Sequence, residues 1–90
     1  MPGAGDRSMK YQIIYEKAAV KFLRKQPPVQ QKRLVAAIHL LPEEGDIKPM
    51  AGHPGEYRLR VGPYRVLYAV EGTVLIVRVL AIGNRGDVYK

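Results

Sequence analysis

The chain has 90 residues, 47% of them hydrophobic, and a formal net charge of +7. This length allows one domain with its own core, and the positive charge predicts an anionic partner, either nucleic acid or an acidic protein. The sequence contains no cysteine, which excludes a disulfide framework and a thiolate metal site and favours the cytoplasm, while its longest apolar runs are too short for a membrane span.

The N-terminal half predicts one strand followed by two helices. Residues 1–8 are interpreted as a flexible leader before a single domain over residues 9–90. Residues 10–15 are rich in β-forming residues and predict a short strand. Apolar residues then recur at helical spacing over 16–26 and 28–41, and a proline follows each segment. The short connection between them predicts an antiparallel helix hairpin.

The C-terminal half predicts three consecutive antiparallel strands. Residues 43–54 contain two prolines and two glycines and are expected to be an irregular lead-in. Gly62-Pro63 suits a two-residue type II′ turn, because glycine supplies the positive φ and proline fixes the next φ. Glu71-Gly72 is expected to form a second turn of the same length.

These turns give the sheet two chemically different faces. With two residues in each turn, Arg60 is expected to face Arg65, and Arg65 in turn to face Arg78. Directly opposed residues share a face, and faces alternate along a strand. One face therefore carries the expected core residues Tyr57, Leu59, Val61, Tyr64, Val66, Tyr68, Val70, Leu75, Val77 and Val79. The other face carries Arg58, Arg60, Arg65 and Arg78, all expected to be exposed.

The expected fold is α+β, with the element order β-α-α-β-β-β in two layers. An antiparallel sheet of about four strands carries the helix hairpin on one face, which covers the apolar side chains. The arginine face stays open and forms a shallow basic concavity. Such a surface suits a strand of nucleic acid or a docking peptide.

The column of arginines favours a ligand on that face. Like charges directly opposed destabilise a sheet by about 0.2–1 kcal/mol per pair, so Arg60, Arg65 and Arg78 oppose folding unless an anion lies over them. The planar guanidinium matches phosphate oxygens in a bidentate manner, which indicates a phosphate-binding surface. The alternative is that these long side chains extend into solvent and cover apolar ground.

Common catalytic motifs are absent from the sequence. It has no phosphate-binding loop, nucleophile elbow or metal-binding spacing of His, Asp and Glu. His39 is expected to be partly buried and structural, and His53 to be solvated. Beyond the last strand, Arg85 can fold over the arginine face. Tyr89 can stack on a base or serve as a hydrophobic anchor.

The stretches GEYRLRVGPYRVLYAVEG and VLAIGNRGDVY carry a family resemblance. They resemble the RelE/ParE superfamily of type II toxins, and within it the RelE-like mRNA endoribonucleases. Such enzymes cleave mRNA in the ribosomal A site by attack of a ribose 2′-OH on the adjacent phosphate, with no metal or cofactor. The resemblance implies five catalytic residues, which are Arg58, Arg60, Arg65, Arg85 and Tyr89. Two further residues, Arg78 and Lys90, are expected to bind RNA.

The resemblance also implies partners. These are the ribosome with its mRNA and a cognate acidic antitoxin, RelB-like or similar, through which an otherwise monomeric toxin oligomerises. Some relatives have lysine at the positions of Arg58 and Arg60, and many have histidine at that of Asn84. The resemblance therefore leaves the general base open. The alternatives are a ParE-like toxin that inhibits DNA gyrase and a non-catalytic RNA-binding or ribosome-binding module.

Overall fold

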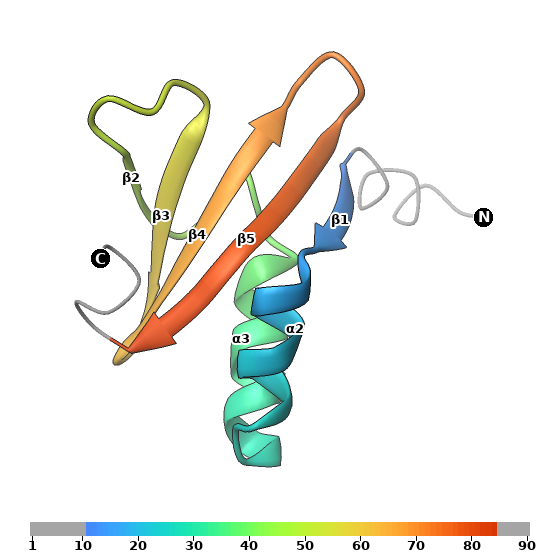
Figure 1. Cartoon of the computed structure of the whole chain (residues 1–90), viewed down its shortest axis with the longest axis vertical. Coiled ribbons are helices and arrows are strands. Elements are labelled where there is room, and N and C mark those ends of the chain that lie inside the picture. The colour runs from blue at the N-terminus through green and yellow to red at the C-terminus, as the bar shows by residue number, and fades with distance from the viewer. Residues whose placement is uncertain (1–10, 85–90) are drawn as a thin grey trace.

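The computed structural model describes residues 11–84, which form a five-stranded mixed sheet and two helices. The sheet has the strand order β1-β5-β4-β3-β2, in which only the β1–β5 pair is parallel. In Figure 1 the helices lie together at one end of the fan of strands. The predicted α+β class is confirmed. The elements are β1 (Gln12–Tyr15), α2 (Lys17–Arg24), α3 (Pro28–Ile38), β2 (Asp46–Pro49), β3 (Glu56–Val61), β4 (Tyr64–Glu71) and β5 (Ile76–Asn84).

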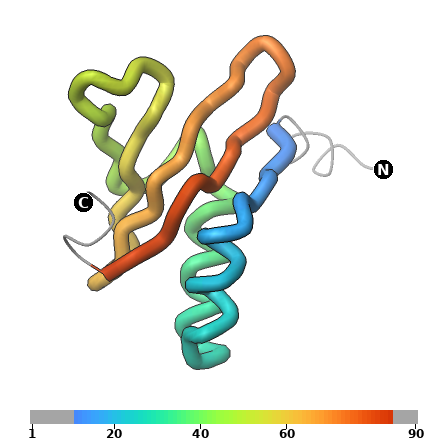
Figure 2. The backbone as a smooth tube through the Cα atoms, viewed as in Figure 1, coloured from blue at the N-terminus to red at the C-terminus, as the bar shows by residue number. Residues whose placement is uncertain are grey.

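Prolines separate the two helices. Pro28 lies in the first turn of α3, where its missing N–H removes no helical hydrogen bond. The side-chain amide of Gln31 donates to the carbonyl oxygen of Gln26 at 2.7 Å across the connection. The chain descends through α2, coloured blue to cyan, and returns through α3, so the helix hairpin is confirmed (Figure 2). Within the described residues, neither helix is long and apolar enough to cross a membrane.

The hydrophobic core lies between the helices and one face of the sheet. Ala19 of α2 and Leu34 and Ile38 of α3 are fully buried against it. Because side chains alternate between faces, the buried sheet residues come mainly from every second position. They are Leu59, Val61, Tyr64, Val66, Tyr68, Val77, Val79 and Ile82, with Tyr57 and Val70 packed against them. The prediction that the helices cover one face of the sheet is confirmed.

Strand β2 replaces part of the irregular segment predicted over residues 43–54. It pairs antiparallel with β3, and Ile47, opposite Leu59, packs against the core. Pro49 is tolerated because β2 is an edge strand, where an absent N–H breaks no ladder. The prediction of an antiparallel sheet of about four strands is therefore wrong in two respects. The observed sheet has five strands, and β1 joins it in parallel.

The connection between β4 and β5 also differs from the prediction. Residues 72–75 form a four-residue loop, and Leu75 has a φ of +55°. A register shift follows between Leu67 and Tyr68. Arg78 therefore faces Ala69, and the expected Arg65–Arg78 pair does not exist.

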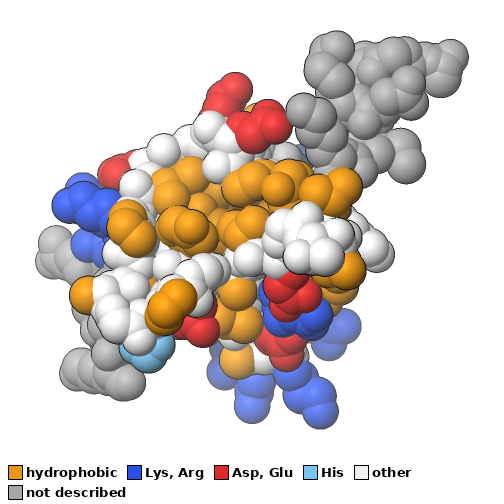
Figure 3. All heavy atoms as spheres, turned by 90° about the horizontal axis from the view of Figure 1, so that it is seen from above, with side chains coloured by type: hydrophobic (Ala, Val, Ile, Leu, Met, Phe, Trp, Pro, Cys, Tyr) orange, Lys and Arg blue, Asp and Glu red, His pale blue; other side chains and the backbone are white. Residues whose placement is uncertain are grey.

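The longer loop also removes Leu75 from the core. The Leu75 residue is 46% exposed, contrary to the prediction, and its neighbour Val74 is 59% exposed. This loop lies at the upper end of the sheet in Figure 1. Seen from above, hydrophobic side chains gather across the middle of the molecule, while Lys and Arg side chains lie towards its margins (Figure 3).

Candidate functional site

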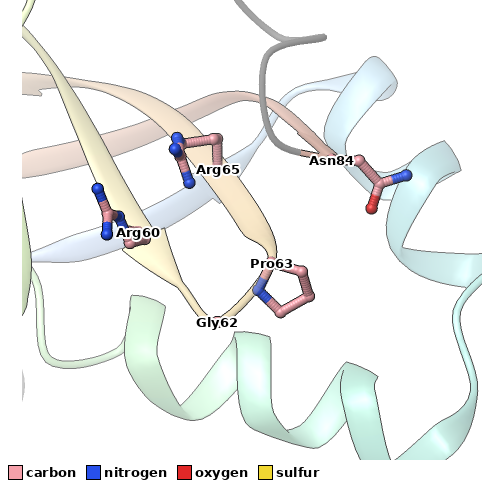
Figure 4. A pocket seen from close by; sticks show the side chains of 5 residues that line it. All are labelled: Arg60, Gly62, Pro63, Arg65 and Asn84. Carbon is pink, nitrogen blue, oxygen red and sulfur yellow. The ribbon is translucent and has the colours of Figure 1, made fainter.

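An open hollow lies at the end of the sheet where β3 turns into β4. Its volume is about 660 Å³, and it is here called the hairpin hollow. Figure 4 shows Arg60 and Arg65 projecting from the two strands of the hairpin, with Asn84 on the other side of Pro63. Three neighbouring strands thus contribute to one concave site. Its lining residues are Arg60, Gly62, Pro63, Arg65 and Asn84.

The turn between β3 and β4 sets the geometry of the hairpin hollow. Gly62 has a φ of +57° and precedes proline, as the type II′ prediction requires. The resulting register opposes Arg60 and Arg65, so this predicted pair is confirmed. On its other side, Arg65 pairs with Gly83 of β5.

Within residues 11–84, Arg65 is the arginine of this face that has no carboxylate partner. Its residue is partly buried. Over residues 11–84, no hydrogen bond or ion pair engages its guanidinium. A guanidinium carries five N–H donors in a fixed planar arrangement. Arg65 therefore offers to the hairpin hollow a cation whose N–H donors have no partner among the described residues.

Asp46 of β2 pairs with both arginines of β3. Its Oδ2 lies 3.5 Å from Nε of Arg60, and its Oδ1 lies 3.8 Å from Nη1 of Arg58. Nη1 of Arg58 also donates to the Asp46 carbonyl oxygen at 3.5 Å. The Arg60 side chain is half exposed, whereas the Arg58 residue is only 6% exposed. The prediction that Arg58 is exposed is wrong, because β2 flanks β3 and brings a carboxylate to it.

Arg78 lies away from the hairpin hollow, on β5 beside β1. Its Nε donates to Glu71 at 2.9 Å, and its Nη1 donates to Glu16 at 3.1 Å. The hydrogen bond from Arg78 lowers the pKa of Glu71 below its usual value. Hydrogen bonds to Glu71 and then Glu16 raise the pKa of Arg78. Two carboxylates therefore balance this cation, and the predicted column of three arginines is reduced to the Arg60–Arg65 pair.

The structure does not test every candidate residue. Arg85, Tyr89 and Lys90 lie outside the described residues, so their roles stay predictions. His53 is exposed, as expected, while His39 is exposed rather than partly buried, because it caps the C-terminus of α3. In the part of the chain that the structure describes, no group of three His, Cys, Asp or Glu side chains could hold a metal ion.

Sequence reasoning missed two residues near this site. Asp46 lies in the segment 43–54, which the sequence predicts to be irregular. The polar-apolar-polar pattern around Ile47 is nevertheless typical of an edge strand. Arg33 of α3 reaches the turn from the helix layer. A Cβ atom added to Gly62 would lie 2.8 Å from its Nη2 atom. No local pattern in the sequence predicts this contact, since it depends on how α3 packs on the hairpin.

Comparison with known proteins places the chain in a family. A family model described as the ParE toxin of the type II toxin–antitoxin system parDE matches residues 13–89. Over 88 residues, the chain is 32% identical to a protein from Methanocaldococcus jannaschii that carries the name toxin RelE1, covering 91% of this chain and 98% of that protein.

Solved structures agree with this placement. One chain of the RelE–RelB complex from Pyrococcus horikoshii OT3 matches with a TM-score of 0.72 and 26% identity, covering 88% of this chain and 99% of that one. A chain of the RelB–RelE antitoxin–toxin complex from Methanococcus jannaschii matches with a TM-score of 0.66 and 30% identity, covering 84% and 94%. The protein therefore belongs to the RelE/ParE superfamily of type II toxin–antitoxin toxins.

Proposed function

We propose that this toxin is a ribosome-dependent endoribonuclease that cleaves translated mRNA. The observation that carries the proposal is the guanidinium of Arg65, which lines the hairpin hollow beside Arg60 and has no counter-charge among the described residues. Two adjacent guanidinium groups suit the oxygens of one phosphodiester, because each can donate two parallel hydrogen bonds.

The proposed reaction is attack of a ribose 2′-OH on the adjacent phosphate, without a metal ion. The 2′-OH loses its proton to water as a bond forms between the 2′ oxygen and phosphorus, and the bond from phosphorus to the 5′ oxygen breaks with its electron pair going to that oxygen. The 5′ oxygen takes up a proton from water, which leaves a 2′,3′-cyclic phosphate and a free 5′-OH with no net change in protons. Negative charge grows on the non-bridging oxygens in the transition state, where Arg65 and Arg60 would stabilise it. Neither arginine is a suitable general base, because a guanidinium keeps its proton in proteins. Their proposed role is electrostatic.

The remaining predicted residues enter the proposal in supporting roles. Arg58 is nearly buried, so it would act through the shape of the site more than by direct phosphate contact. Arg85 and Tyr89 are proposed to contact the substrate after β5, and Lys90 to bind RNA. Arg78 also stays a proposed RNA contact, although its two carboxylate partners leave it less available than Arg65.

The proposed regulator is a cognate acidic antitoxin. The solved relatives from P. horikoshii and M. jannaschii are complexes of RelE with RelB, and this chain has a net charge of +7. An acidic partner would therefore be attracted at long range. We propose that the toxin alone is a monomer and that any larger assembly forms through the antitoxin. Action on translating ribosomes would take place in the cytoplasm.

A second candidate function is inhibition of DNA gyrase. It is favoured by one observation, namely that the matching family model is described as a ParE toxin. A toxin of this kind would act on a protein target and would need no phosphate-binding pair. The guanidinium of Arg65, which has no carboxylate partner over residues 11–84, supports the nuclease more directly.

One experiment separates the candidates. The purified toxin is incubated with ribosomes programmed with a defined mRNA, and primer extension locates any cleavage. A parallel assay follows supercoiling of plasmid DNA by gyrase. The proposal predicts new mRNA ends that depend on the ribosome, and unchanged supercoiling. Loss of supercoiling without mRNA cleavage would favour the gyrase poison, and ribosome binding with neither effect would indicate a non-catalytic module.

A further inference from the structure

Asp46 lies where it can act on two arginines of the site at once. It is paired in register with Arg60, so its side chain shares the sheet face of Arg60 and Arg58. One carboxylate oxygen is 3.5 Å from Arg60, and the other is 3.8 Å from Arg58. Each carboxylate oxygen of Asp46 therefore lies near a different guanidinium group.

Arg58 requires such a partner. A charged group removed from water is costly unless an opposite charge and hydrogen bonds compensate it. Its side chain is 7% exposed, and within the described residues Asp46 supplies the one carboxylate at ion-pair distance. The carbonyl oxygen of Asp46 accepts a hydrogen bond from the same guanidinium. Asp46 therefore provides both the opposite charge and a hydrogen-bond acceptor for the nearly buried guanidinium of Arg58.

Arg60 is held differently. Oδ2 of Asp46 lies 3.5 Å from its Nε, and its two Nη atoms donate no hydrogen bond to any described residue. A guanidinium is planar, so a contact at Nε restrains the plane and leaves the outer donors for a ligand. Arg60 also lines the hairpin hollow opposite Arg65. The carboxylate thus lies on the β2 side of Arg60, and the hollow lies on its β4 side.

We propose that Asp46 is a positioning residue of the nuclease site, which holds Arg58 in place and orients Arg60 towards a phosphate bound beside Arg65. This inference rests on the proposed nuclease function. Asp46 itself touches no substrate. Its negative charge lies near the phosphate site and weakens RNA binding there, so its benefit must come from geometry.

This arrangement predicts opposite effects on binding and on cleavage. Removing the charge in Asp46→Asn takes away a repulsion from phosphate, so RNA affinity should stay equal or rise. Releasing Arg60 should slow the chemical step by about tenfold to a hundredfold, because misplacing a group by about 1 Å has effects of that size. Asp46→Glu keeps the charge and moves the carboxylate by one methylene group. Its rate should lie between those of the wild type and Asp46→Asn.

The test combines three measurements on the full chain. Single-turnover cleavage is measured on programmed ribosomes, and affinity is measured on the same ribosomes carrying a 2′-O-methyl mRNA that lacks the attacking hydroxyl. The Nε–H signals of the arginines are recorded by ¹⁵N NMR. The matched control is Glu44→Gln, which removes one exposed carboxylate from the preceding loop and makes the same change in net charge.

The proposal expects Asp46→Asn to cleave slowly, to bind at least as tightly as the wild type, and to shift the Arg60 Nε–H signal, while the control behaves like the wild type. Equal or faster cleavage by Asp46→Asn would overturn it, as would an unmoved Arg60 signal. If Asp46→Asn does not fold, Asp46→Glu decides: wild-type cleavage with an unmoved Arg60 signal would contradict positioning. A wild-type toxin that cleaves nothing would refute the nuclease function, whereas the NMR result would still test the contact itself.

Discussion

Arg60 and Arg65 face each other across the turn between β3 and β4, and Arg60 alone of the two has a carboxylate partner within residues 11–84. Two cations on directly opposed residues repel each other, and within residues 11–84 Asp46 offsets the charge of Arg60 only. An anion between them would relieve the repulsion. The site is therefore arranged to gain stability from a bound phosphate.

Replacing Arg65 should not destabilise the fold. In Arg65→Gln one directly opposed pair of like charges disappears, which we expect to stabilise the protein by about 0.2–1 kcal/mol. The gain should shrink with added salt, because the repulsion is partly screened. Urea unfolding at low and high ionic strength measures both effects. Clear destabilisation at low salt would mean that Arg65 has a structural partner.

Gly62 should tolerate substitution poorly. Its φ of +57° costs a residue with a Cβ about 1–2 kcal/mol, and the added atom would also displace the Arg33 guanidinium. Gly62→Ala should therefore lower the free energy of unfolding by at least about 1 kcal/mol. Gly72→Ala is the control, since no atom lies within 4 Å of a Cβ there. Equal stability of the two variants would contradict the type II′ turn.

Much of this fold was predictable from the sequence where local chemistry determines it. Gly62-Pro63 specifies a two-residue turn, and that turn fixes Arg60 opposite Arg65. The prolines at the ends of the two helical segments predict the number and order of the helices. The core followed from alternation along β3 and β4, because each apolar residue at every second position points to the helices.

The remaining features depend on contacts that no local pattern specifies. The β4–β5 loop has four residues and includes Leu75 at a positive φ, although Leu75 is not glycine, and this longer loop moves Arg78 away from Arg65. The register shift at Leu67 and Tyr68 adds to this change. Strand β2 has one residue packed on the core, Ile47, and forms because β3 offers a free edge. Asp46 was therefore missed together with its strand.

Leu75 should gain from a residue that accepts its backbone conformation. Asparagine visits the left-handed region more readily than leucine, so Leu75→Asn should stabilise the protein by up to about 1 kcal/mol. Val74→Asn is the matched control in the same exposed loop. Thermal melting of both variants tests this. A lower melting temperature for Leu75→Asn than for Val74→Asn would show that the exposed leucine makes a stabilising contact.

Arg78 should stabilise the fold in a pH-dependent manner. The pKa of Glu71 lies below its ordinary value of 4.5 in the folded state, because Arg78 donates to its carboxylate. This contribution is fully present above pH 4.5 and is lost as the pH falls through the folded-state pKa. Arg78→Gln should thus melt below the wild type at neutral pH, and the gap should close in acid. Melting curves across this range test it, and a gap unchanged in acid would contradict the Glu71 pair.

The most direct measurement of the central claim is single-turnover cleavage by Arg65→Ala on programmed ribosomes, with ribosome affinity and melting temperature measured on the same samples. If Arg65 stabilises charge that develops in the transition state, the cleavage rate should fall by about 10²–10³-fold while affinity changes far less. Arg65→Lys should recover part of the rate, since it keeps the charge and loses the planar donors. Wild-type cleavage by Arg65→Ala would remove this residue from the reaction and contradict the proposed nuclease site.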